Sequence, residues 1–210
     1  MDENRRPIRT RSAGWAKRIT DRLVASHISP NQISVASIGF ALFGAVALNV
    51  STGVLGSLLC ILGIQLRLLC NLFDGMVAIE GGKKSTLGTL YNEFPDRVAD
   101  SLLIGGLGYA IGHPELGWFA ALLAALTAYV RVFGGSLGLA QQFIGPMAKQ
   151  HRMAVMTGGL VLNLIETLTL GSFYMLSFAL WVITLGSAIT CVTRTQAIAR
   201  QLKEPRHVDQ

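Results

Sequence analysis

The sequence predicts an all-α integral membrane protein with six transmembrane helices and an amphipathic interfacial helix at its N-terminus. Of its 210 residues, 51% are hydrophobic and 14% are charged. No Lys, Arg, Asp or Glu lies between Arg22 and Arg67, which is unusual for a soluble domain. Six segments are long enough to cross a hydrocarbon core of ~30 Å. They are residues 33–50, 54–79, 87–111, 118 to about 139, 153–170 and 173–192.

The segment before the first span has the pattern of a surface helix. Between residues 14 and 24, the apolar residues Trp15, Ile19 and Leu23 recur at i, i+4 and i+8. The basic residues of the segment occupy other positions: Lys17, Arg18 and Arg22. A helix of this kind lies flat among lipid headgroups. We expect it to be an orienting anchor.

The first span begins with a strong helix-start pattern. Ser29 is suited to the N-cap, Pro30 to the first helical position, and Gln32 to the reciprocal position of a capping box. The charged N-terminus has no early apolar run, so we expect no cleaved signal peptide.

Basic residues are distributed unevenly among the predicted loops. Seven of the 18 precede the first span, and the loops near Ser51, His113 and Gly171 contain none. The positive-inside rule then places both termini in the cytoplasm, as in a bacterial-type inner or plasma membrane. We expect three parts: a cytoplasmic segment (1–27), a six-helix membrane domain (28–194) and a basic tail (195–210). Orientation and anionic lipid explain the net charge of +6 better than nucleic acid does.

Polar residues interrupt the second and third spans with helical spacing. Arg67, Asn71, Asp74 and Ala78 fall on one helix face, and so do Asn92, Asp96 and Asp100. Ionisable groups at membrane depth are expensive and usually functional. If the two faces converge, their carboxylate and amide oxygens suit a hard cation such as Mg²⁺. There are two alternatives. The acids and the arginines of these helices could neutralise each other in structural ion pairs, or the acids could form a proton or ion pathway.

The spacing of these residues resembles the signature of the CDP-alcohol phosphotransferase family, D-x-x-D-G-x-x-A-R, eight residues, G-x-x-x-D-x-x-x-D. Asp74-Gly75-x-x-Ala78, Gly88 and positions 92 and 96 keep that spacing. The six spans, the amphipathic helix and the Ser29-Pro30-Asn31-Gln32 helix start are also similar to the family. The resemblance therefore covers nearly the whole chain. It departs from the signature at three positions: Asn71, Ile79 and Asn92.

The resemblance implies roles at matching positions. Asn71, Asp74 and Asn92 would be metal ligands, and Asp96 would ligate metal and act as the general base. The small residues of the signature would contact the CDP group: Gly75, Ala78 and Gly88. An alternative register matches Asp96 and Asp100 to the last two acids, but it requires a four-residue insertion after Gly88.

The metal count follows from the charges. Four carboxylates would balance two Mg²⁺ ions, whereas Asp74 and Asp96 supply half of that charge. We expect one Mg²⁺ or Mn²⁺ ion, or two if the diphosphate and Glu93 or Asp100 make up the difference. The signature has an Arg where this chain has Ile79, and Lys83 or Lys84 could supply the missing positive charge.

The reaction implied by the resemblance is attack by an alcohol hydroxyl on CDP-diacylglycerol or a related CDP-alcohol, with release of CMP. Three basic residues near the cytoplasmic level could bind a phosphorylated or polyol acceptor: Arg131, Lys149 and Arg152. Lys149 and Arg152 could instead be cytoplasmic charges at helix ends that only orient the protein in the membrane. A homodimer is also implied. A catalytically degenerate scaffold and a small transporter are the competing functions.

Overall fold

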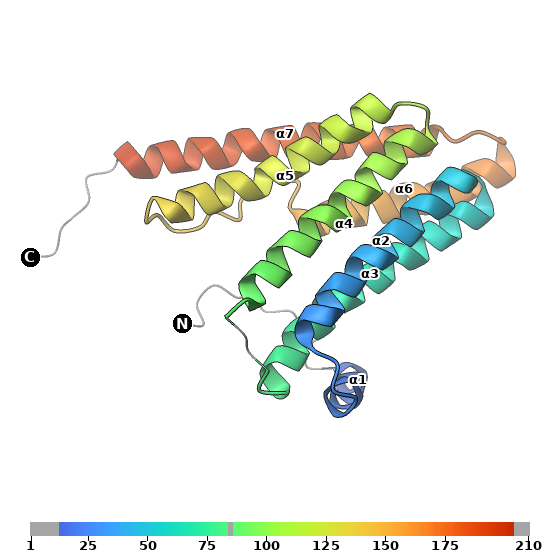
Figure 1. The fold of residues 1–210 in the computed structure, drawn as a ribbon. Helices are drawn as coiled ribbons and strands as arrows, with labels where there is room; N and C mark the ends of the chain where they lie inside the picture. Colours follow the sequence, from blue (N-terminus) through green and yellow to red (C-terminus); the bar gives the residue numbers. More distant parts are fainter. Residues whose placement is uncertain (1–12, 84–85, 204–210) are drawn as a thin grey trace, which may run out of the picture. The chain divides into compact units, whose positions relative to one another are not determined.

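The computed structural model describes residues 13–83 and 86–203, which form seven α-helices and no strand (Figure 1). The prediction of an all-α protein is confirmed for this part of the chain. The helices are α1 (Gly14–Ala25), α2 (Pro30–Val50), α3 (Val54–Glu80), α4 (Gly88–Ala110), α5 (Pro114–Ser136), α6 (Lys149–Thr169) and α7 (Tyr174–Lys203). Some of the basic residues that define the charge pattern lie outside the described residues: Arg5, Arg6, Arg9, Arg11, Lys84 and Arg206.

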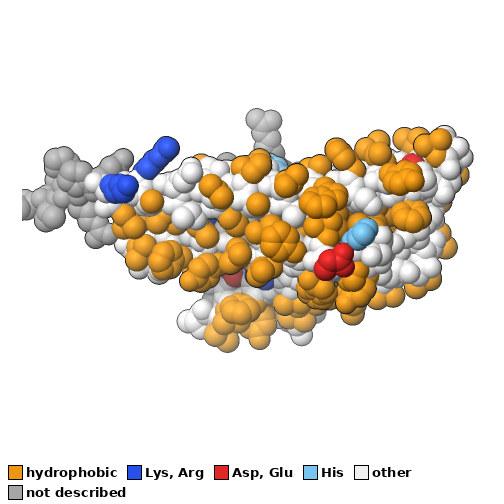
Figure 2. All heavy atoms as spheres, turned by 90° about the horizontal axis from the view of Figure 1, so that it is seen from above, with side chains coloured by type: hydrophobic (Ala, Val, Ile, Leu, Met, Phe, Trp, Pro, Cys, Tyr) orange, Lys and Arg blue, Asp and Glu red, His pale blue; other side chains and the backbone are white. Residues whose placement is uncertain are grey.

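Within the described part of the chain, four helices are long and apolar enough to cross a membrane: α2, α3, α5 and α7. Large apolar side chains remain exposed along them, as lipid contact requires, and Figure 2 shows one face on which such side chains predominate. Helices α4 and α6 are long enough but less apolar, because each carries several charged and amide groups. The chain is therefore a multi-pass membrane protein.

The last helix extends well beyond the apolar segment that predicted it. That segment ended at residue 192, whereas α7 continues to Lys203. The predicted end was the end of the hydrophobic stretch. The backbone hydrogen bonds of α7 continue beyond it, through the polar residues that follow. Helix α5 is shifted in the other direction, beginning at Pro114 rather than at residue 118.

The chain divides into two compact units, which are described separately. Unit 1 comprises Met1–Phe40 and Gln65–Ala99, and unit 2 comprises Ala41–Ile64 and Asp100–Gln210. Helices α2, α3 and α4 each contribute one part to unit 1 and the other part to unit 2.

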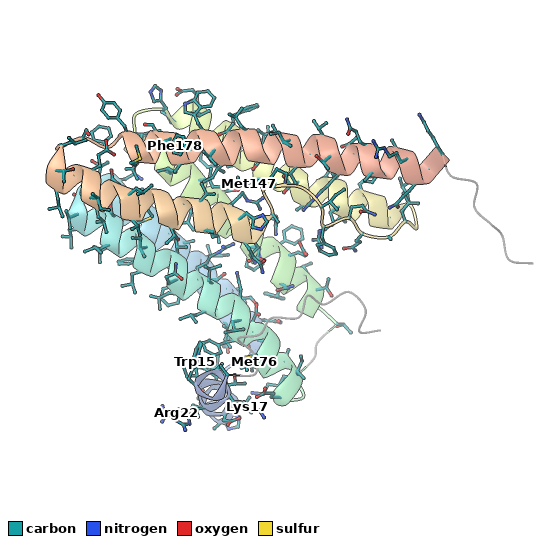
Figure 3. All side chains as sticks on the ribbon, turned by 180° about the vertical axis from the view of Figure 1, so that it is seen from behind. Trp15, Lys17, Arg22, Met76, Met147 and Phe178 are labelled. Carbon is teal, nitrogen blue, oxygen red and sulfur yellow. The ribbon has the colours of Figure 1, made fainter. Side chains whose placement is uncertain are left out.

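In unit 1, α1 packs on α3 through apolar side chains. Ala16 and Val77 are fully buried, and the Trp15 ring meets Phe73 edge-on at 6.2 Å between centroids. Trp15 nevertheless stays 46% exposed, and Figure 3 shows Lys17 and Arg22 on the other side of α1. Helix α1 thus buries Ala16, leaves the apolar Trp15 partly exposed and carries its charged residues on another face.

The capping box at the start of α2 is confirmed. The Ser29 backbone N–H donates to Gln32 Oε1 at 2.9 Å, and the Gln32 N–H donates to Ser29 Oγ at 3.2 Å. Both bonds satisfy donors that a helix N-terminus leaves without intrahelical partners. This start fixes where α2 begins and therefore which of its side chains face α3.

Unit 2 depends on close backbone approach between helices. A Cβ atom added to Gly108 of α4 would lie 2.6 Å from the Cα of Gly117 in α5, so neither position has room for a side chain. Helix α7 packs against both α5 and α6, and a Cβ atom on Gly159 would lie 2.5 Å from Ala179 Cβ. Small residues allow such contacts where lipid gives no hydrophobic drive between helices.

Candidate active site

Unit 1 brings polar side chains of α3 and α4 together. Asp74 of α3 and Asp96 of α4 are each 6% exposed, and Arg67 of α3 is fully buried. The remaining signature residues are less enclosed: Asn71, Gly75, Ala78 and Gly88 are half-buried, and Asn92 is exposed. The two carboxylates that the signature spacing singles out are therefore both buried.

Hydrogen bonds from Ser34 and Gly75 orient Asp74. Ser34 Oγ of α2 donates to Asp74 Oδ2 at 2.7 Å, and the Gly75 backbone N–H donates to Asp74 Oδ1. Ser34 is 4% exposed and was absent from the predicted site. Its sequence signal was weak, since a serine near a helix start is common. Only the packing of α2 on α3 places its hydroxyl on the carboxylate.

Asp96 lies between two guanidinium groups of different exposure. Arg67 Nη2 is 3.4 Å from Asp96 Oδ1, while Arg97 Nη2 is 4.0 Å from Asp96 Oδ2 and 3.9 Å from Glu93 Oε2. The Arg97 side chain is 26% exposed. Pro95, inside α4, has no N–H and leaves one carbonyl of the preceding turn without its helical donor.

The donor atoms in unit 1 fit a hard divalent cation. Asp74 and Asp96 offer carboxylate oxygens, and the buried Nδ2 of Asn71 has no hydrogen-bond partner. Rotation of the Asn71 amide about its Cβ–Cγ bond would put the amide oxygen in that place. In the described residues no cluster of three His, Cys, Asp or Glu side chains is placed to hold a metal. Amide oxygens from Asn would have to complete the ligand set.

In unit 2, Asp100 and Arg152 form a buried ion pair. Arg152 Nη2 donates to Asp100 Oδ2 at 2.8 Å, and their side chains are 1% and 3% exposed. Arg152 Nη1 also donates to the Met147 carbonyl at 2.9 Å and to Thr127 Oγ1 at 3.3 Å. This pairing was absent from the prediction, which treated Asp100 as a metal-site acid and Arg152 as an acceptor-binding cation.

The other predicted acceptor cations lie at the ends of α5 and α6. Arg131 Nη1 donates to Gln141 Oε1 at 3.1 Å, and its guanidinium carbon is 5.3 Å from the centroid of the Phe143 ring. Lys149 is the first residue of α6 and is half-buried. The acceptor-binding roles of these residues stay predictions.

Arg194 is a buried cation that was not among the predicted site residues. It is 4% exposed, and it donates from Nε to the Ile144 carbonyl at 2.9 Å and from Nη1 to the Thr127 carbonyl at 2.6 Å. The only signal in the sequence was its position shortly after an apolar run. Because α7 continues past that run, Arg194 is helical and enclosed by α5 and the loop before α6.

The fold and the site define a helical membrane protein with two buried carboxylates in a phosphotransferase-like spacing. No protein-family model matches the chain. It is 28% identical over 204 residues to a phosphatidylinositol phosphate synthase of Cutibacterium acnes, covering 90% of this chain and 95% of the relative. This similarity confirms the resemblance to the CDP-alcohol phosphotransferase family.

Two solved structures of phosphatidylinositol phosphate synthase from Mycobacterium tuberculosis have the same fold. The one with CDP-DAG bound has a TM-score of 0.77 at 17% identity and covers 94% of this chain and 98% of its own. The one in complex with manganese and citrate has a TM-score of 0.76 at 17% identity, and the match covers 93% of this chain and 92% of that protein's chain.

Proposed function

We propose that this protein transfers a phosphatidyl group from CDP-diacylglycerol, or a related CDP-alcohol, to the hydroxyl of a polyol or polyol phosphate in phospholipid synthesis. The observation that supports this most is the pair of buried carboxylates, Asp74 and Asp96, on two helices at the family spacing. The phosphatidylinositol phosphate synthases named above, one of them with CDP-DAG bound, support the same reaction class.

In the proposed reaction, the acceptor oxygen attacks the β-phosphorus of the CDP-lipid in line with the bond to CMP. The new P–O bond forms, the P–O bond to CMP breaks, and CMP leaves with the bonding electron pair. Asp96 takes the hydroxyl proton, because a positioned carboxylate is a suitable general base. Gly75, Ala78 and Gly88 supply small surfaces on which the cytidine diphosphate can lie against the backbone.

Asn71, Asp74, Asn92 and Asp96 would hold a divalent cation, either Mg²⁺ or Mn²⁺. When bound, the cation would neutralise charge that develops on the diphosphate. Ser34 keeps the Asp74 carboxylate fixed for this purpose, through the 2.7 Å bond described above. The structure of a relative with manganese and citrate supports a divalent cation of this kind.

We further propose that α2 to α7 all span the membrane, that both termini are cytoplasmic, and that α1 lies in the headgroup layer. In α4 and α6, Arg97 pairs with Glu93, and four charged side chains are buried: Asp96, Asp100, Arg152 and Glu166. Burial and pairing lower the cost of placing these two helices in lipid. The parts would then be residues 1–27, a membrane domain of 28–194 and a basic tail of 195–210. A homodimer is part of the same proposal.

The function is tested by CMP release in liposomes. The purified protein should release CMP from CDP-diacylglycerol only when Mg²⁺ or Mn²⁺ and an acceptor are both present, and a panel of polyols and polyol phosphates should identify the acceptor. A heat-inactivated sample is the control for hydrolysis. Absence of release with every acceptor, in protein that remains folded, would favour a non-catalytic scaffold instead.

The Arg131→Ala variant should raise the KM for a phosphorylated acceptor about tenfold and change the kcat little. A guanidinium that binds the acceptor phosphate contributes mostly to substrate binding, and a charge-assisted hydrogen bond is worth roughly 1.5–3 kcal/mol. Steady-state kinetics with varied acceptor measure this. The matched control is Arg200→Ala, an exposed arginine near the end of α7. Equal KM values for all three proteins would exclude Arg131 from acceptor binding.

A further inference from the structure

Arg67 places a permanent positive charge inside the candidate site. It is fully buried in unit 1, on the same face of α3 as Asn71 and Asp74, and its Nη2 atom is 3.4 Å from Asp96 Oδ1. A guanidinium keeps its proton in proteins. Asp96 therefore faces a fixed cation whether or not a metal ion is bound nearby.

The buried charges of unit 1 are few enough to count. Among its described residues, the buried charged side chains are Arg67, Asp74 and Asp96, which carry one positive and two negative charges. The net charge is therefore −1. Glu93 and Arg97, both partly exposed, carry opposite charges 3.9 Å apart and add nothing to it.

This count differs from that of a site built on four aspartates. Four carboxylates carry −4, which two divalent cations neutralise. Here Asn71 and Asn92 remove two negative charges, and Arg67 adds a positive charge. Two divalent cations would leave the site at +3, and one would leave it at +1. At short range and low effective dielectric, the extra repulsion is large.

We infer that Arg67 takes the place of one metal ion, so that the site binds a single divalent cation beside a fixed guanidinium. This inference rests on the proposed function, because it assumes that the signature residues hold a metal. The competing explanation is that Arg67 only neutralises Asp96. Buried ion pairs of that kind add little stability when compared with apolar packing, so they do not explain why a charged residue lies here.

Metal stoichiometry tests the inference without any activity measurement. Calorimetric titration of the detergent-solubilised full chain with Mn²⁺, with electron paramagnetic resonance of bound Mn²⁺, should show one tight ion per chain. The Arg67→Met variant, which keeps an unbranched apolar stem and removes the charge, should bind Mn²⁺ at least about tenfold more tightly or bind a second ion. Mn²⁺ should also raise its melting temperature more than that of the unaltered protein.

Arg97→Met is the matched control, because Arg97 also neighbours Asp96 but is partly exposed and more distant. Its Mn²⁺ affinity should change less than about twofold, since solvent screens its charge. Two tight Mn²⁺ ions in the unaltered chain would overturn the inference, and this result needs no variant to fold. Unchanged Mn²⁺ affinity in folded Arg67→Met protein would also overturn it and assign Arg67 a structural role.

The outcomes separate this inference from the proposed function. One tight Mn²⁺ ion without CMP release would overturn the transferase proposal and leave the charge substitution intact. CMP release with two bound ions would overturn the charge substitution alone.

Discussion

Replacing Asp96 with Asn should lower the rate of CMP release by about 10²- to 10⁴-fold, the range expected for loss of a general base. The amide has nearly the same shape as the carboxylate but cannot take the acceptor proton. The variant also leaves Arg67 facing a neutral group, so its stability must be measured alongside activity. Single-turnover CMP release in liposomes, at saturating CDP-diacylglycerol and acceptor, isolates the chemical step.

Glu80→Gln is the matched control for Asp96→Asn. Glu80 is an exposed acid at the end of α3, outside the candidate site. It should retain full activity. If Asp96→Asn keeps more than half of the rate while its melting temperature is unchanged, Asp96 is not the base, and the alternative register that assigns this role to Asp100 gains support.

Removing one partner of the Asp100–Arg152 pair should destabilise the protein by about 3–5 kcal/mol, because the remaining charge is left buried and uncompensated. Asp100→Leu and Arg152→Met should each show the loss. Replacing both with apolar residues, as in Asp100→Leu/Arg152→Met, should recover much of it. Reversible unfolding in mixed micelles, carried out on the single and double variants, measures the coupling.

The exposed pair of His113 and Glu115 serves as the control for this cycle. Its side chains are 62% and 72% exposed, and their atoms are 3.1 Å apart. Solvent screening makes such pairs weak, so His113→Gln and Glu115→Gln should leave the unfolding midpoint unchanged. If the destabilisation of the Asp100 and Arg152 double variant equals the sum of those of the single variants, the two residues do not stabilise each other.

Local rules predicted the helices well where the sequence carried local signals. The Ser29–Gln32 capping box places the start of α2 correctly, because both of its hydrogen bonds form within four residues. The helical spacing of Arg67 and Asp74 likewise places them on one face of α3. The end of α7 was predicted less well, because a hydropathy boundary is not a hydrogen-bonding boundary.

The same rules could not assign partners to charged residues. Asp100 and Arg152 are 52 positions apart in the chain, and Ser34 and Asp74 are 40 apart. No local pattern links them, since a charged residue near a helix end reads equally well as an orienting charge, a ligand or half of an ion pair. Each of these contacts required the helices to be packed.

The sequence by itself determined that the chain is helical, that it belongs in a membrane, and which two carboxylates stand at the signature positions. Composition, helical period and residue spacing contain that information. Only the tertiary structure decided that Asp74 is oriented by Ser34, that Asp96 faces the buried Arg67, and that Asp100 is engaged by Arg152. The reason is physical: a buried charge must be compensated, and the compensating group can come from any helix that packing brings within reach.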